Sequence, residues 1–129
     1  MTHEPFAELE KLNLITEQII GCAYTVSNTL GIGFLEKVYE NALAIELRKK
    51  GLLFTQQAPI KVTYKGLVIG DYVADLLVED AVLVELKAVK ALDENQLAQC
   101  INYLKSSNLR ICLLINFGTK RIQIKRIAN

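Results

Sequence analysis

Apolar residues recur at every third or fourth position along residues 8–30, which is the period of one face of an α-helix. The pattern predicts a helix over 8–30 whose inner side holds Leu9, Leu12, Ile15, Ile19, Ala23, Val26 and Leu30. A second helix is predicted over 34–50, with Leu35, Val38, Tyr39, Ala42, Leu43 and Leu47 on its inner side. Gly31 and Gly51 follow these segments and are typical of helix ends.

After residue 51 the pattern changes to short β-branched and aromatic runs separated by turn residues. Strands are predicted over 60–64, 67–69, 72–78 and 82–89, with turns at Lys65-Gly66 and Gly70-Asp71. Asp93 and Gln96 have the spacing of a helix cap, so a third helix should follow and end near 106–108. The continuous apolar run over 110–117 is typical of a central strand, whereas 121–127 is typical of an edge strand.

This order of elements predicts a mixed β-sheet flanked by helices, in the α/β or α+β class. The 129 residues suit a single domain over 1–129, and a composition of 51% hydrophobic and 22% charged residues excludes a disordered tail. The acidic N-terminus does not resemble a signal peptide, and no apolar run approaches the ~20 residues that span a bilayer. We therefore expect a soluble, cytoplasmic protein with no membrane partner.

The cysteines, the histidine and the distribution of charge limit the kinds of active site that the chain can form. Cys22, Cys100 and Cys112 lie in apolar surroundings and are predicted to be reduced core thiols. The one histidine, His3, makes a Cys/His nucleophile or a zinc site improbable. Residues 1–86 hold 7 Lys/Arg and 12 Asp/Glu, and residues 87–129 hold 8 and 2. An acidic metal centre beside a basic phosphate-binding surface would produce this asymmetry, although scattered solvated charge produces it more often.

Side-chain parity brings three charged residues together. Leu76 and Val78 share one face of their strand, and Val82, Val84 and Leu86 share one face of the next. Burying both apolar sets on the same side requires an odd loop, expected to be three residues, 79–81 or 80–82. Asp75 then lies on the same face as Glu85 and Lys87, directly opposite one of them.

Two nearby carboxylates make each other's ionisation costly and are typical ligands of hard divalent cations, of which Mg²⁺ suits this set best. Lys87 would orient or deprotonate a water and offset charge on phosphoryl oxygens. The alternative is a structural cross-strand ion pair between Lys87 and Asp75 or Glu85, since Glu-x-Lys is a common pattern. The apolar strand around Glu85 argues for the functional interpretation, because unpaired charge is expensive there.

The ordered set resembles the core of the PD-(D/E)xK nuclease superfamily, in which a helix precedes a hairpin bearing Asp and then Glu-x-Lys. More narrowly, the segment Gly33-Phe34-Leu35-Glu36-Lys37-Val38-Tyr39 is similar to the motif of the GxxExxY protein family, which is grouped with that superfamily. The resemblance covers roughly residues 14–127. It implies a restriction-endonuclease-like core and a nuclease that hydrolyses DNA or RNA with a water activated by Mg²⁺ or Mn²⁺.

Carried over by this resemblance, the metal ligands are Asp75, Glu85, Glu36 and the backbone carbonyl of Leu86, and Lys87 is the catalytic lysine. Glu36 would be the helix acid that points at the metal or at a metal-bound water; the alternative is an ordinary solvated helix acid.

Gln99 and Tyr103 match the Gln-x-x-x-Tyr motif of the exonuclease branch, share a helix face and are expected to support the site. The alternatives are an exposed Gln99 and a Tyr103 in the core with its hydroxyl at the edge. Tyr39 is expected to be a core aromatic residue.

The chain also departs from the family pattern. Ala74 stands where Pro precedes the Asp, which leaves the metal chemistry untouched. Ser27 and Gln96 stand where members of the narrower family often carry His, which bears on whether this chain retains activity.

Basic residues near the C-terminus are the candidates for phosphate contacts: Lys90, Lys105, Arg110, Lys120, Arg121, Lys125 and Arg126. The expected partner is nucleic acid, with DNA as the favoured substrate. The competing hypothesis is a non-catalytic nucleic-acid-binding or assembly module that retains the nuclease fold. A partner protein, or a homodimer formed through the edge strand 121–127, is a third hypothesis.

Overall fold

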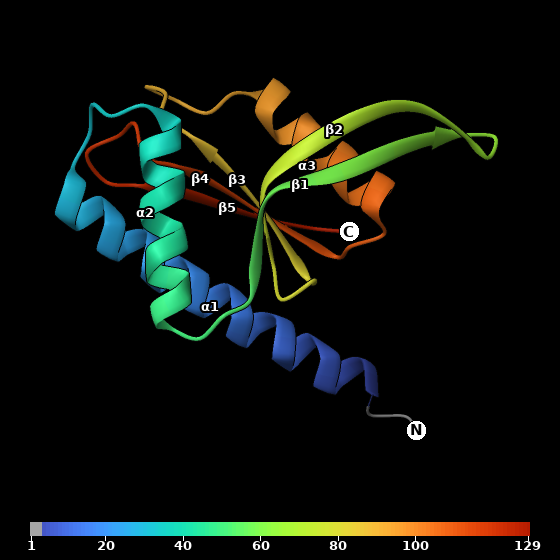
Figure 1. The fold of residues 1–129 in the computed structure, drawn as a ribbon, viewed down its shortest axis with the longest axis horizontal. Helices are drawn as coiled ribbons and strands as arrows, with labels where there is room; N and C mark the ends of the chain where they lie inside the picture. Colours follow the sequence, from blue (N-terminus) through green and yellow to red (C-terminus); the bar gives the residue numbers. More distant parts are fainter. Residues whose placement is uncertain (1–3) are drawn as a thin grey trace.

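A five-stranded mixed sheet forms the centre of the fold, in the order β1-β2-β3-β4-β5. The computed structural model describes residues 4–129 (Figure 1). The helices are α1 (Glu4–Leu30), α2 (Glu36–Lys49) and α3 (Glu94–Ser107). The strands are β1 (Phe54–Tyr64), β2 (Leu67–Val78), β3 (Val82–Lys87), β4 (Ile111–Asn116) and β5 (Gln123–Ala128). Only the β3–β4 pair is parallel, with α3 as its crossover, so the predicted mixed sheet flanked by helices is confirmed.

The sheet separates two hydrophobic clusters. On one face α1 and α2 pack on alternate residues of the central strands, among them Leu76, Val84 and Leu113. On the other face α3 packs on the residues between them, such as Leu83 and Leu114. All six residues of β4 are buried, as predicted for a strand covered on both sides, and β5 is the predicted edge strand.

The β1–β2 hairpin is longer than the sequence pattern predicted. The predicted turn at Gly70-Asp71 is wrong: β2 runs without a break through both residues, and Gly70 pairs with Val62 where the register shifts. A glycine inside a strand marks an irregularity of the ladder here, not its end. The turn at Lys65-Gly66 is confirmed, with positive φ at both residues. Figure 1 shows the outer part of the hairpin running alongside α3.

The helices agree with the predictions in the core and differ at their ends. The stripe from Leu12 to Val26 is buried, but Leu9, Leu35 and Val38 are exposed, so their predicted inward placement is wrong. Leu9 lies near the start of α1, Leu35 is the N-cap residue of α2, and Val38 lies in the first turn of α2. The cap of α3 is confirmed as a capping box in which Asp93 and Gln96 bond each other's backbone N–H.

The predicted core thiols are confirmed, since all three cysteines are buried and free. His3, on which the argument against a Cys/His site rested, lies outside the described residues. Within residues 4–129, no helix combines the length and the apolar character needed to cross a membrane.

Candidate active site

The register of the β2–β3 hairpin places Asp75 against Glu85. Leu76 pairs with Val84, and Val78 pairs with Val82, which leaves a loop of three residues, 79–81. Glu79 and Asp80 in this loop have φ of 55° and 51°. The predicted three-residue loop between the two strands is therefore confirmed, and of the two alternatives, 79–81 and 80–82, the structure has 79–81. One step beyond Leu76 and Val84 the ladder ends, and the next two residues are the carboxylates.

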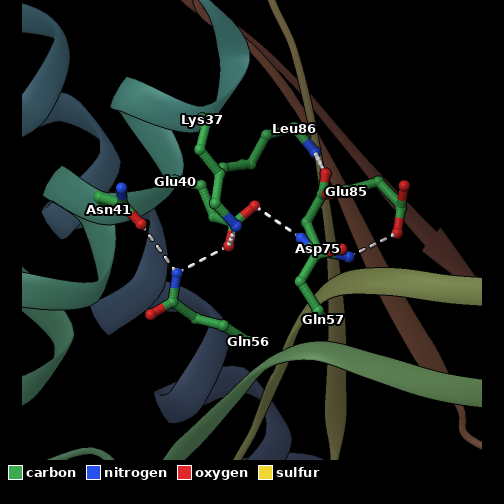
Figure 2. A network of polar contacts seen from close by, with 8 residues as sticks. All are labelled: Lys37, Glu40, Asn41, Gln56, Gln57, Asp75, Glu85 and Leu86. Carbon is green, nitrogen blue, oxygen red and sulfur yellow. Dashed lines mark hydrogen bonds and ion pairs between the residues drawn. The ribbon is translucent and has the colours of Figure 1, made fainter.

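Asp75 and Glu85 are interlocked through the backbone of the opposite strand (Figure 2). The backbone N–H of Asp75 donates to Glu85 Oε1 at 3.0 Å, and the backbone N–H of Leu86 donates to Asp75 Oδ2 at 2.7 Å. Each side chain thus replaces a ladder hydrogen bond at the point where β2 diverges from β3. The two carboxylates are held in place by the sheet itself and need no cationic partner for their position.

The electrostatics of this pair are unfavourable to ionisation. Glu85 is 4% exposed, and burial, followed by the charge of Asp75, raises its pKa to about 8. Burial also raises the pKa of Asp75, against the hydrogen bond from Leu86, and the charges of Glu40 and Glu36 raise it further. A site whose carboxylates resist ionisation is one that a cation would stabilise.

Lys87 does not neutralise the pair. Among residues 4–129 neither Asp75 nor Glu85 forms an ion pair with any Lys or Arg, so the structural cross-strand ion pair is absent. Lys87 is partly exposed at the end of β3, near enough for its charge to lower the pKa of Glu85 slightly against the larger effects. Its ammonium group is therefore available to a ligand.

Glu40 is a carboxylate that the sequence interpretation missed. Its side chain is 4% exposed. It accepts hydrogen bonds from Gln56 at 2.6 Å and Gln57 at 2.8 Å and forms an ion pair with Lys37 at 3.0 Å (Figure 2). Its position four residues after Glu36, on the same helix face, was the available signal. Glu36 is exposed in the first turn of α2, and both acids act on Asp75.

Tyr39 explains how the helix that bears these acids is oriented. Its hydroxyl donates to the carbonyl of Gly31 at 2.7 Å and accepts from the backbone N–H of Phe34 at 3.3 Å. Its ring stacks on Phe117 with centroids 4.6 Å apart. Gly33 has φ of 112°, which favours glycine at the bend before α2. The expected core role of Tyr39 is confirmed, and the tyrosine ties the start of α2 to the end of β4.

Gln99 and Tyr103 lie on the face of α3 that meets the hairpin, where they line a pocket of about 220 Å³ with Tyr72. Tyr103 is 4% exposed. Burial, and then the charges of Glu85 and Asp75, raise its pKa to about 12. The structure thus brings the predicted supporting pair to the same side of the sheet as the carboxylates. A larger cavity of about 440 Å³, lined in part by Asp80 and Leu83, contains none of the predicted site residues.

Comparison with known proteins agrees with this geometry. The sequence profile of the PD-(D/E)XK nuclease superfamily matches residues 13–127. The chain belongs to this superfamily. Two solved structures are similar to it. An alkaline exonuclease, LHK-Exo from Laribacter hongkongensis, superposes with a TM-score of 0.54 at 16% identity, covering 72% of this chain and 55% of the exonuclease. SSO0001 superposes with a TM-score of 0.54 at 15% identity, covering 72% and 49%.

These superpositions establish a shared fold, and the chain spans about half the length of the two structures it matches. No curated protein sequence matches it. The mixed sheet with its flanking helices is therefore the PD-(D/E)XK nuclease fold.

The donor set suits a divalent cation of the kind PD-(D/E)XK nucleases generally use. Asp75 and Glu85 oppose each other's ionisation, and neither forms an ion pair among residues 4–129. Mg²⁺ and Mn²⁺ bind such carboxylates together with water and phosphate. Among the side chains that the structure describes, those of residues 6–129, no three His, Cys, Asp or Glu form a group that could hold a metal ion. The protein would supply two carboxylate ligands, and the remaining positions would go to a carbonyl, water and substrate.

The predicted basic residues divide into two groups. Lys90, Lys120 and Arg121 are exposed and belong to the loops that follow the parallel strands β3 and β4. Asn116 holds these loops together: its side chain accepts from the backbone N–H of Val89 at 3.0 Å and donates to the carbonyl of Val89 at 2.9 Å. The three cations therefore share the sheet edge at which Lys87 ends β3.

The second group faces elsewhere. Arg110 lies at the opposite end of β4, where it pairs with Glu8 at 3.7 Å, and Arg126 bonds Asn13 at 2.6 Å. Lys125 is exposed on the edge strand β5. Lys105 is exposed on α3, close to the pocket that contains Tyr103. The structure therefore brings Lys90, Lys120 and Arg121 to the end of the sheet at which Lys87 ends β3. Lys105 lies in the last turn of α3, next to Ser106 and Ser107, which line the cavity beside Asp80, and Arg110 lies at the opposite end of β4.

Proposed function

We propose that this protein is a divalent-metal-dependent nuclease that hydrolyses phosphodiester bonds in DNA or RNA. Membership of the PD-(D/E)XK nuclease superfamily supports the proposal. The observation that carries it is the interlocked pair of Asp75 and Glu85, two carboxylates with raised pKa values and no ion pair among residues 4–129.

In this proposal Asp75, Glu85 and the carbonyl of Leu86 hold Mg²⁺ or Mn²⁺. When bound, the cation supplies Lewis-acid activation of water and of the phosphoryl oxygens. Lys87 lies on the same strand and offsets charge that develops on the phosphate, or orients the attacking water. The sheet fixes both carboxylates through backbone hydrogen bonds, so the site is organised before substrate binds.

Glu40 and Glu36 supply further negative charge from α2. Glu40 is the better placed to remain fixed, because three side chains hold its carboxylate. Glu36 is exposed and would act by orienting water at the mouth of the site. The motif formed by Gly33, Glu36 and Tyr39 supports assignment to the GxxExxY family within the superfamily. In that assignment the glycine and the tyrosine orient α2, and the acids do the chemistry.

Phosphate contacts are proposed for Lys90, Lys105, Lys120 and Arg121. These cations are exposed, and none forms an ion pair among residues 4–129. They would bind the nucleic-acid backbone on either side of the scissile bond.

A direct test measures cleavage of labelled DNA and RNA in Mg²⁺, in Mn²⁺ and in EDTA. Asp75→Asn and Lys87→Ala should abolish cleavage while their far-ultraviolet circular dichroism stays that of the parent. Lys61→Ala is the matched control, since Lys61 is exposed and paired with Asp71 on the distant part of the hairpin. Cleavage that survives both site substitutions would refute the proposal.

A non-catalytic nucleic-acid-binding module is the second candidate. One observation favours it: among the described side chains, those of residues 6–129, no third His, Cys, Asp or Glu completes a metal-binding group. Salt-sensitive binding without hydrolysis, and without a shift in melting temperature on adding Mn²⁺, would select this function.

A further inference from the structure

A pocket of about 220 Å³ lies between the outer part of β2 and the exposed side of α3. Its lining consists of two tyrosines, three amide side chains and one alanine: Tyr72, Tyr103, Asn95, Gln99, Asn102 and Ala98. No charged side chain lines it. The pocket is therefore suited to a neutral, polar and aromatic group, and not to a phosphate.

The aromatic part of the pocket is only half covered by the protein. The rings of Tyr72 and Tyr103 lie 5.6 Å apart at an angle of 45°, and Tyr72 is 48% exposed. An exposed ring beside a buried one offers a free π-face on a rigid support. Such a face binds a nucleobase by stacking, whatever the base.

The polar part of the pocket contains an unpartnered group. Tyr103 is 4% exposed, and its hydroxyl has no hydrogen-bond partner among residues 4–129. Every fully enclosed side-chain polar atom among the described residues has a hydrogen-bond partner. Because the hydroxyl of Tyr103 has none, it is not fully enclosed, and it opens onto the pocket that Tyr103 lines. Gln99 and Asn102 add amides that both donate and accept. Together these groups match the hydrogen-bonding edge of a base, which is accessible only when the base is unpaired.

The position of the pocket relates it to the carboxylates. Tyr72 precedes Asp75 by three residues on the same strand, a separation of about 10 Å. Tyr103 packs in the same cluster as Ala74 and Leu83, the neighbours of the site on β2 and β3. Lys105, one turn further along α3 than Asn102, is exposed and available to a phosphate. A base in the pocket would thus belong to a nucleotide close to the scissile phosphate.

We infer that this pocket binds an unpaired nucleobase and that the protein therefore acts on single-stranded nucleic acid or on unpaired ends. The inference rests on the proposed function, because it names the substrate of the same site. Stacking on Tyr72 holds the base, and the groups of Tyr103, Gln99 and Asn102 contact its edge. Duplex nucleic acid cannot enter in this way without losing a base pair.

Fluorescence anisotropy of the whole chain with labelled oligonucleotides in EDTA tests the inference without catalysis. The probes are an oligodeoxyuridylate, an oligouridylate of equal length and a blunt DNA duplex. We expect tighter binding to a single strand than to the duplex. Tyr72→Ala should weaken that binding about tenfold or more, because stacking of one base contributes a factor of this order. Whichever single strand binds more tightly identifies the sugar, and the Tyr72 effect is expected on that strand.

Tyr64→Ala is the matched control, since Tyr64 is an exposed tyrosine of the same hairpin outside the pocket. It should leave binding unchanged. Asn102→Asp provides a second, exposed substitution that places negative charge in the pocket and should also weaken binding. Equal binding of duplex and single strand, or equal effects of the two tyrosine substitutions, would overturn the inference.

The same experiment separates the inference from the nuclease proposal. In Mn²⁺, Asp75→Asn should lose cleavage, and in EDTA it should retain single-strand binding. If no cleavage occurs but binding depends on Tyr72, the nuclease proposal alone fails. If cleavage occurs but single-strand binding does not depend on Tyr72, the base pocket alone fails.

Discussion

Replacing Glu85 by Gln should change how the stability of the metal-free protein depends on pH. The substitution keeps the shape of the side chain, and the amide oxygen can still accept from the backbone N–H of Asp75. It removes the proton that Glu85 would otherwise bind or release. Any difference between the two proteins therefore reports the titration of this one buried group.

The raised pKa of Glu85 determines whether stability rises or falls with pH. In the unfolded chain Glu85 loses its proton near the ordinary value of 4.5, whereas in the folded protein it keeps the proton up to about 8. Between these values the folded state binds more protons than the unfolded state, so the free energy of unfolding falls as pH rises. At about 1.4 kcal/mol for each pH unit, the loss across the whole window reaches roughly 5 kcal/mol at most. The Glu85→Gln protein lacks this dependence.

Urea unfolding in EDTA, followed by far-ultraviolet circular dichroism at intervals from pH 5 to pH 9, measures the effect. The two proteins should have similar stability near pH 5. Near pH 9 the Glu85→Gln protein should be more stable than the parent by several kcal/mol. Glu17→Gln, an exposed acid on α1, is the control and should follow the parent.

A parent stability that stays constant or rises from pH 5 to pH 8 would contradict the argument. So would a Glu85→Gln protein with the same pH dependence as the parent. Either result would show that Glu85 ionises normally in the folded chain. Burial in the sheet would then add no free-energy cost to the ionised carboxylate, and a bound cation would have no such cost to offset.

Further expected outcomes concern the metal, α2 and the cap of α3. Binding of Mn²⁺ requires ionised carboxylates, so calorimetry should show an affinity that rises from pH 6 to pH 8, with release of protons. Glu40→Gln should reduce the Mn²⁺-induced increase in melting temperature more than Glu36→Gln does; the reverse order would make Glu36 the principal acid of α2. Tyr39→Phe should cost about 1 kcal/mol in urea unfolding, because it removes the bonds to Gly31 and Phe34 but keeps the ring. Asp93→Ala should cost a similar amount by removing the capping box, and an unchanged midpoint would contradict that role.

Local patterns were sufficient for the elements that face the core. The helical stripe from Leu12 to Val26, the box at Asp93 and Gln96, and the buried run of β4 depend on contacts within a few residues or on burial of a whole segment. Side-chain parity was also sufficient for the β2–β3 loop, because a slip of one residue would turn the apolar residues of one strand to the opposite face. The sequence pattern alone therefore predicts that Asp75 lies on the face of Glu85, directly opposite either Glu85 or Lys87.

The tertiary structure decided which acids face that pair and what each one contacts. Nothing local distinguishes Glu40 from Glu36, since both lie on one face of α2. Gln56 and Gln57 of β1 bond the buried carboxylate of Glu40, whereas Glu36 stays exposed. Likewise Gly70 and Asp71 are residue types typical of turns, but the pairing of β2 with β1 keeps Gly70 in a strand. The register that brings Asp75 to the face of Glu85 follows from the sequence. The burial of Glu40 and the pocket between Tyr72 and Tyr103 arise only because distant strands and helices meet there.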